Sequence, residues 1–154
     1  MEEPEELAAR GYNISECERV IVPIHTGSPD SGHWTLAVAD LPTRQLQYYD
    51  SMGDATMSSK GASVLDTLRQ YIVDQASYEL ERVPDGWREK NQWTMVAPAV
   101  PQQSNGRDCG VFTMMYAKCV AEEAGEPRFR FGTEDMKAIR KAICVSLCRP
   151  LFDP

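Results

Sequence analysis

Cys109 is the residue of this chain best placed to act as a nucleophile. It lies between Asp108 and Gly110, directly before the run V-F-T-M-M-Y-A-K-C-V. Apolar residues recur in that run with a helical period, so Cys109 is predicted to stand at or near the first turn of a helix. The partial positive charge at a helix N-terminus favours the thiolate, which is the reactive form of cysteine.

A second group suited to the same chemistry lies on the loop before the cysteine. Gln103 is six residues upstream of Cys109, among the turn formers Pro101, Asn105 and Gly106, and such a loop can fold the amide back beside the sulfur. Acyl transfer by a thiol needs a base, a group that orients the base, and hydrogen-bond donors for the oxyanion. The predicted donors are the Gln103 side-chain amide and the backbone N–H of Cys109.

The choice of base is narrow because the chain has only two histidines, His25 and His33. His33 opens the strand-like run H-W-T-L-A-V-A-D, and Asp50 closes a second run, Q-L-Q-Y-Y-D. The short connection L-P-T-R predicts an antiparallel hairpin, which brings His33 opposite Asp50–Met52 at one end of a sheet. His33 is therefore the predicted base and Asp50 its orienting carboxylate, whereas His25, within an apolar strand, is predicted to be structural.

The other elements are predicted from hydrophobic periodicity and turn residues. Strands are expected at 19–25, 33–40, 45–50 and 93–100, and helices at 62–75, at 109–124 and from an N-cap at Thr133 to about Cys148. Pro23 predicts an edge position or a bulge for the first strand. Residues 1–18 are expected to be an acidic tail with a short helical piece at 5–10. The mixed order without a βαβ repeat predicts a single α+β domain over 1–154.

Composition limits the classes of function. The 154 residues are 42% hydrophobic and 25% charged, with a net charge of −7, which argues against a nucleic-acid-binding protein. The five cysteines are odd in number and show no C-x-x-C pair, and the acidic N-terminus lacks a signal peptide, so a reducing intracellular compartment is predicted. No apolar stretch is long enough for a transmembrane helix, and no membrane association is expected.

The remaining sulfur-containing residues are predicted to have no chemical role. Cys144 and Cys148 have the i, i+4 spacing that could hold a metal on one helix face, but no third ligand lies nearby in the sequence, so packing in the core is predicted. Met114 and Met115 are predicted to fill the core as well. No metal and no cofactor are expected.

Three blocks of the sequence resemble the SUMO-specific (sentrin-specific, or ubiquitin-like-protein-specific) cysteine proteases. They are H-W-T-L-A-V-A-D, Y-Y-D-S-M-G and P-Q-Q-S-N-G-R-D-C-G-V-F, and V-P-I-H ahead of the first block also matches. The resemblance covers roughly Val20 to the end. It implies an α+β, papain-like cysteine protease fold with a small mixed or antiparallel sheet flanked by helices. It also implies Cys109 as nucleophile, His33 as base, Asp50 as orienting carboxylate and Gln103 in the oxyanion hole.

The same resemblance implies a substrate-binding role for Trp34 and a set of partners. In this family the tryptophan after the base covers a tunnel that admits a Gly-Gly tail, because an indole over a backbone channel leaves no space for a Cβ. The implied partners are SUMO or another ubiquitin-like modifier and its conjugated target proteins, met by a monomer in the nucleus or the cytoplasm. Family domains carry several tens of residues more before the V-P-I-H strand, so the N-terminal part of the domain is expected to be missing here.

Three alternatives remain open at this point. The same set of residues could cleave ubiquitin or another ubiquitin-like tail. Related folds in some bacterial effectors use it for acetyl transfer, although the net acidity of this chain disfavours the polyphosphate pocket that such enzymes need. A short chain could also bind a modifier without turning it over.

Overall fold

The computed structural model describes residues 14–28, 31–53, 55–78, 84–123 and 127–148. The elements in chain order are η1 (Ile14–Glu16), β1 (Arg19–Thr26), β2 (His33–Asp40), β3 (Gln45–Tyr49), α2 (Ser59–Tyr78), η2 (Lys90–Gln92), β4 (Thr94–Val96), α3 (Cys109–Glu122), η3 (Thr133–Asp135) and α4 (Met136–Cys148).

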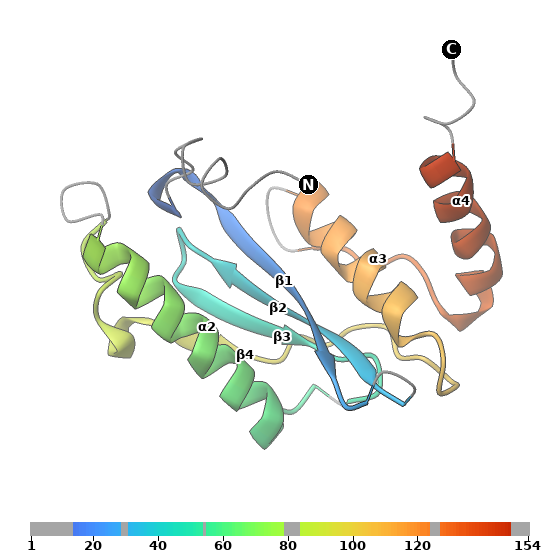
Figure 1. Ribbon diagram of the computed structural model, residues 1–154, viewed down its shortest axis with the longest axis horizontal. Helices are drawn as coiled ribbons and strands as arrows, with labels where there is room; N and C mark the ends of the chain where they lie inside the picture. The colour runs from blue at the N-terminus through green and yellow to red at the C-terminus, as the bar shows by residue number, and fades with distance from the viewer. Residues whose placement is uncertain (1–13, 29–30, 54, 79–83, 124–126, 149–154) are drawn as a thin grey trace, which may run out of the picture.

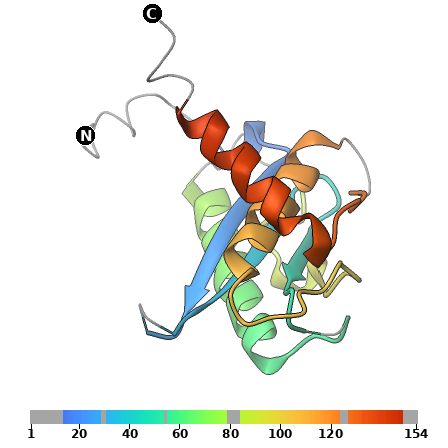
Figure 2. The same ribbon diagram turned by 90° about the vertical axis from the view of Figure 1, so that its right-hand side faces the viewer.

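The described strands form one mixed sheet in the order β1-β2-β3-β4. The first three are antiparallel neighbours, and β4 runs parallel to β3. Helix α2 covers one face of the sheet and α3 the other, as Figure 1 shows. Helix α4 packs on the outer side of α3 (Figure 2). This arrangement confirms the predicted α+β class and the predicted small mixed sheet.

The β2–β3 hairpin has the predicted geometry. Its pairs run from Asp40 opposite Gln45 to Leu36 opposite Tyr49. Continued along β2, this register places His33 opposite Met52, within the predicted range. The turn closes with Arg44 at a φ of 52°.

Strand β1 lies at an edge of the sheet, as Pro23 predicted. Pro23 is paired with Leu36 of β2, and the other side of β1 has no strand among the described residues. An edge tolerates proline because the missing N–H is not needed by a second neighbour.

The central strand β2 is buried on both faces, and its alternation builds two cores. Ala37 and Ala39 pack with Leu65 and Ile72 of α2, while the intervening Leu36 and Val38 face α3. On the α3 side the buried aromatic side chains are Tyr49, Phe112 and Tyr116. Truncating one such ring to alanine typically costs about 3–5 kcal/mol, so this layer fixes the position of α3 against the hairpin.

Gly61 marks the closest approach of α2 to the sheet. A Cβ at this position would lie 2.7 Å from Cδ1 of Tyr48, a ring that is itself buried. Alanine gains about 1 kcal/mol of helix propensity over glycine. Overpacking a filled core costs roughly 1–3 kcal/mol. We therefore expect Gly61→Ala to lower the free energy of unfolding by about 1 kcal/mol, measured by urea denaturation.

The matched control is Ser63→Ala, which adds helix propensity at an exposed position of the same helix. It should raise the free energy of unfolding by a few tenths of a kcal/mol, roughly the propensity difference. A Gly61→Ala variant that is more stable than the wild type would contradict the packing described for Tyr48.

Several predicted boundaries were wrong. Helix α2 spans 59–78 instead of 62–75. The strand predicted at 93–100 is reduced to Thr94–Val96, because Pro98 and Pro101 lack the N–H that a ladder needs. Thr133 does not cap a helix; it opens η3, whose N-cap is Gly132, and α4 begins only at Met136. Helix α3 ends at Glu122 instead of 124, because Glu123 is already extended. The helical piece at 5–10 lies outside the described residues.

Three side chains predicted for the core are exposed. Cys144 and Cys148 face solvent, and Met114 is 48% exposed. The buried face of α4 is set instead by Met136, Ile139 and Ile143, which recur every three or four residues and pack toward α3. Cys144 and Cys148 do not lie on this buried face. Met115 is partly buried against the core as predicted.

Candidate active site

His33 and Asp50 meet at one end of the hairpin. Nε2 of His33 lies 2.7 Å from Oδ1 of Asp50, and each side chain is about a quarter exposed (25% and 24%). The backbone N–H of Met52 donates to the same carboxylate oxygen at 2.9 Å and fixes its orientation. With Nε2 engaged, Nδ1 is the ring nitrogen that stays available for a proton from a nucleophile.

Cys109 is the first residue of α3 and its side chain is buried. The N–H groups in the first turn of a helix have no acceptor within the helix, so the N–H of Cys109 can donate outward. Among the described hydrogen bonds, none joins the Cys109 thiol to the ring of His33. Contacts of this kind are often long in ligand-free enzymes and shorten when substrate binds.

Trp34 links the hairpin to the start of α3. A Cβ built at Gly110 would stand 3.6 Å from Cδ1 of Trp34, so the residue after His33 lies close to the residue after Cys109. The indole is 40% exposed. On another side it meets the ring of His25, with centroids 4.8 Å apart. His25 is thus a support for Trp34 at the surface, not a histidine of the interior.

Gln103 is held beside the hairpin by its neighbours. Its backbone N–H donates to the carbonyl of Ser51 at 2.9 Å, and the Ser51 hydroxyl donates to Oε1 at 2.6 Å. Nε2 donates to the carbonyl of Asn105. Because a carbonyl can only accept, these partners define which end of the amide is nitrogen. One of the two Nε2 hydrogens remains for an oxyanion.

The loop before the cysteine is tied at two further points. Nε2 of Gln102 donates to the carbonyl of Asp50 at 3.1 Å, and the Tyr116 hydroxyl donates to the carbonyl of Pro101 at 2.5 Å. Burial, with a smaller contribution from the Asp50 charge, raises the pKa of Tyr116. Tyr116 therefore stays protonated and keeps this hydrogen bond at any pH at which a cysteine enzyme works.

Ser51, Asn105 and Tyr116 were not identified as site residues from the sequence. Ser51 and Asn105 belong to the blocks Y-Y-D-S-M-G and Q-S-N-G-R-D, so their position beside Asp50 and Gln103 was an available signal. No sequence signal pointed to Tyr116, because its position in the helical period of α3 is the one expected of an ordinary core residue.

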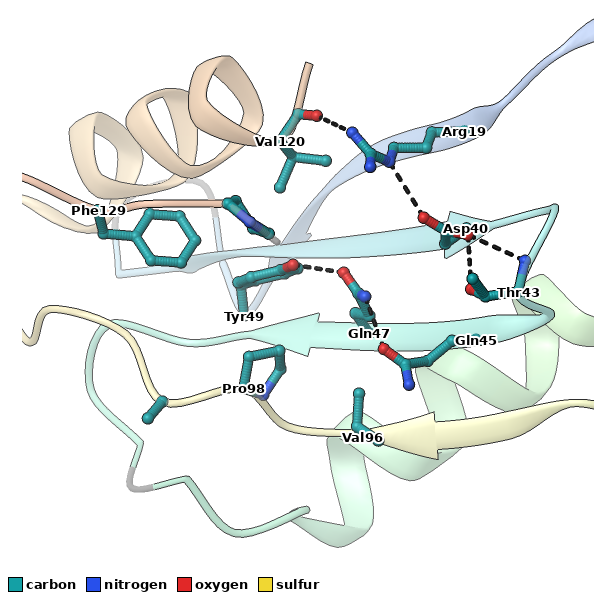
Figure 3. Close-up of a pocket in the computed structure, with 12 residues that line it drawn as sticks. Arg19, Asp40, Thr43, Gln45, Gln47, Tyr49, Val96, Pro98, Val120 and Phe129 are labelled. Atoms are coloured by element: carbon teal, nitrogen blue, oxygen red, sulfur yellow. Dashed lines mark hydrogen bonds and ion pairs between the residues drawn. The ribbon is translucent and has the colours of Figure 1, made fainter. Parts of the chain in front are cut away.

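A hollow at the other end of the sheet does not belong to this site. It is bounded by Asp40, Gln47 and Phe129, as Figure 3 shows. Asp40 is at the opposite end of β2 from His33, about 23 Å away along an extended strand. Arg19 bonds Asp40 at 3.2 Å and donates to the carbonyls of Val120 and Glu123 at 2.6 Å each. Arg19 therefore caps the C-terminus of α3.

Metal sites and membrane spans were sought in the described residues. No three or more His, Cys, Asp or Glu side chains gather there as a metal site. No helix within the same ranges has the length and apolar content needed to span a bilayer.

The site lies in a chain that matches a known family over almost its whole length. The pattern of the "Ulp1 protease family, C-terminal catalytic domain" matches residues 4–151. The chain therefore belongs to the Ulp1 protease family, a family of cysteine proteases. This confirms the resemblance found in the sequence.

Individual relatives are similar over part of their length. The chain is 32% identical over 160 residues to "Sentrin-specific protease 5" of Mus musculus, covering 93% of this chain and 18% of the relative. It is 37% identical over 115 residues to "Sentrin-specific protease 2" of the same species, covering 74% of this chain and 18% of the relative. The chain thus spans about a fifth of the length of these proteins.

Solved structures share the fold. The C-terminal Ulp1 protease domain in complex with Smt3, the yeast ortholog of SUMO, matches with a TM-score of 0.68 at 21% identity, over 88% of this chain and 54% of that one. The catalytic domain of the Chaetomium thermophilum Ulp1-like SUMO protease matches with a TM-score of 0.59 at 28% identity, over 84% and 46%. The predicted fold class is confirmed as that of the Ulp1-like proteases.

Proposed function

We propose that this chain is a thiol protease that cleaves after the C-terminal Gly-Gly of a ubiquitin-like modifier, with SUMO as the preferred one. One observation supports this most directly. The 2.7 Å bond between His33 and Asp50 lies at the end of the hairpin where Trp34 comes close to Gly110, the residue after Cys109. A base with its orienting carboxylate and a cysteine at a helix N-terminus are thus held at the same edge of the sheet.

The chemistry follows from these positions. The Cys109 thiolate, paired with His33, attacks the carbonyl of the modifier's last glycine. The oxyanion that forms accepts hydrogen bonds from the Gln103 amide and the Cys109 N–H, and each such donor typically contributes a factor of about 10²–10³ in rate. His33 protonates the leaving amine as the C–N bond breaks, and water then hydrolyses the thioester.

Two leaving groups fit this scheme. A lysine amine leaves when the modifier is removed from a target protein, and a peptide amine leaves when a precursor is matured. In both reactions Trp34 would lie over the backbone of the modifier tail and select glycine, because a Cβ has no room beneath an indole.

SUMO is favoured over other modifiers by the relatives. The two mouse relatives described above are sentrin-specific proteases, and the solved Ulp1 domain is bound to Smt3. We also propose an intracellular site of action, in the nucleus or the cytoplasm. The five cysteines are all free, as a reducing compartment would keep them.

A panel of modifier precursors tests this function. SUMO, ubiquitin and a third ubiquitin-like protein, each with a short C-terminal extension, are incubated with the chain under reducing conditions and analysed by mass spectrometry. We expect cleavage of the SUMO precursor directly after Gly-Gly. A second SUMO precursor carries Gly-Ala in place of Gly-Gly before the same extension. It should be cut at least about 100-fold more slowly, because an added methyl group that a pocket cannot accept typically costs a factor of this size.

The control for contaminating proteases is the Cys109→Ala protein purified in parallel. If the ubiquitin precursor were cleaved faster than the SUMO precursor, ubiquitin would be the preferred substrate and the proposed mechanism would still hold. Binding of SUMO without cleavage of any precursor would overturn the proposed activity and favour a non-catalytic role.

A further inference from the structure

Asp108 stands at the N-cap of α3 and does not cap it. Aspartate at this position usually accepts hydrogen bonds from the N–H groups of the first turn. Here Asp108 has φ −96° and ψ −2°, and its side chain makes no bond to the helix. The carboxylate next to Cys109 is therefore turned away from the N–H groups at the start of the helix.

Two side chains hold the carboxylate in this position. Nη2 of Arg140, on α4, donates to Oδ1 of Asp108 at 2.6 Å, and Nδ2 of Asn105 donates to Oδ2 at 2.7 Å. The same Nη2 also donates to the carbonyl of Arg107 at 3.2 Å. The bonds from Arg140 and then Asn105 lower the pKa of Asp108, so the carboxylate is charged at neutral pH.

The contacts continue to the other oxyanion donor. Asn105, which bonds Asp108 through its side chain, accepts the Gln103 amide through its carbonyl. The Gln103 amide is in turn held by the Ser51 hydroxyl. An unbroken series of hydrogen bonds thus runs from Arg140 on α4 to the residue after Asp50.

Helix α4 is preceded by a second fixed point for the same loop. The Thr133 hydroxyl of η3 accepts from the N–H of Ser104 at 3.2 Å and lies 3.4 Å from the carbonyl of Gln102, to which it can donate. The C-terminal segment therefore contacts the loop on both sides of Gln103 and again at Asp108.

We propose that Arg140 is a positioning residue that keeps the oxyanion hole of this protease open. It holds the Asp108 carboxylate away from the N–H groups of the first turn of α3. The Asp108 carbonyl already accepts the N–H groups of Val111 and Phe112. Without Arg140, the carboxylate would turn toward the remaining N–H groups at the start of α3, where an N-cap side chain normally accepts the N–H of Gly110. A negative charge would then stand beside the Cys109 N–H, where it opposes the developing oxyanion, and Asn105, which holds the Gln103 amide, would lose its fixed partner.

The inference rests on the proposed function and concerns only how the site is held. Arg140 touches no reacting atom. The oxyanion exists in the transition state and not in bound substrate, so loss of the arginine should lower kcat and leave KM nearly unchanged.

The first experiment measures Arg140→Met on SUMO carrying a C-terminal coumarin amide. Methionine keeps much of the length of the side chain and removes every donor. We expect kcat to fall roughly 10–100-fold and KM to stay within about threefold of the wild type. The upper end of that range approaches the rate factor that one oxyanion donor typically supplies. Arg69→Met is the matched control, since Arg69 forms an ion pair with Asp66 on α2, remote from the site; it should retain the wild-type kcat.

The second measurement distinguishes an effect on oxyanion stabilisation from an effect on SUMO binding or on the reactivity of Cys109. SUMO with a C-terminal bromoethylamide alkylates a cysteine by direct displacement of bromide, a reaction with no oxyanion. We expect Arg140→Met to be labelled at Cys109 at a rate within about threefold of the wild type, because the lost stabilisation is confined to the oxyanion. A general distortion of the site would slow this labelling as much as it slows turnover.

The third variant tests the role given to the charge. In the Arg140→Met protein, Asp108→Asn removes the negative charge that is held to block the hole. We expect this second substitution to recover part of the lost kcat. Two neighbours that acted independently would instead give losses that multiply.

The inference is overturned by any of three results: wild-type kcat in Arg140→Met, labelling that falls in parallel with kcat, or a double variant that is slower than the single one. If the wild-type protein neither cleaves the coumarin amide nor reacts with the bromoethylamide, the proposed function itself fails, and the role of Arg140 with it.

Discussion

Replacing Cys109 by alanine is expected to abolish cleavage of modifier precursors. Alanine removes the sulfur and leaves the helix start, the Gln103 donor and the His33–Asp50 pair in place. Loss of the nucleophile in enzymes of this type lowers kcat by roughly 10⁴-fold or more, because the oxyanion donors and substrate binding that remain give only residual catalysis over water. Release of coumarin from a C-terminal SUMO amide measures the effect.

Cys144→Ala is the matched control, because Cys144 is an exposed cysteine on α4. Its activity should equal that of the wild type. The Cys109→Ala protein should still bind SUMO and unfold at the wild-type temperature. Residual turnover within tenfold of the wild type would show that Cys109 is not the nucleophile.

The second large effect is expected at His33. His33→Gln keeps a polar side chain of similar size but removes the group that accepts and returns the proton, so both thiolate formation and protonation of the leaving amine are lost. We expect kcat to fall by roughly 10³-fold or more, as in enzymes whose nucleophile depends on a paired base. The measurement is the same coumarin assay, repeated from pH 5 to pH 9.

His25→Gln provides the comparison, because it changes the only other histidine. The His25 ring contacts Trp34, and among the described residues it has no carboxylate partner of the kind that Asp50 gives His33. The His25→Gln substitution should change KM more than kcat. Its loss of activity should be much smaller than that of His33→Gln. If His25→Gln lowered kcat as much as His33→Gln or more, the assignment of His33 as the base would be wrong.

The elements that carry the site could be predicted because they depend on local sequence. The apolar run of β2 and a short connection to β3 are enough to define the hairpin, and the hairpin register alone brings His33 near Asp50. The helical period after Cys109 likewise defines α3. The match to the blocks of the Ulp1 family then supplies the roles of these residues, which stay predictions until the variants are measured.

What could not be predicted depends on contacts between distant segments. Arg140 meets Asp108 across 32 positions, and nothing in the spacing of a helix surface indicates which acid an arginine will reach. Thr133 looked like a helix cap because threonine is common at that position, whereas tertiary contact turned its hydroxyl to the loop before Cys109. Met114 was assigned to the core because periodicity alone does not show how wide the buried face of α3 is.

The central claim is that Cys109 attacks the C-terminus of a ubiquitin-like modifier. The most direct measurement is the reaction of the protein with SUMO that ends in a vinyl methyl ester, under reducing conditions, followed by mass spectrometry of the intact product and of its peptides. The account predicts a single adduct of one SUMO per chain, attached at Cys109 and absent from Cys109→Ala. No adduct, or an adduct at any other cysteine, would contradict it.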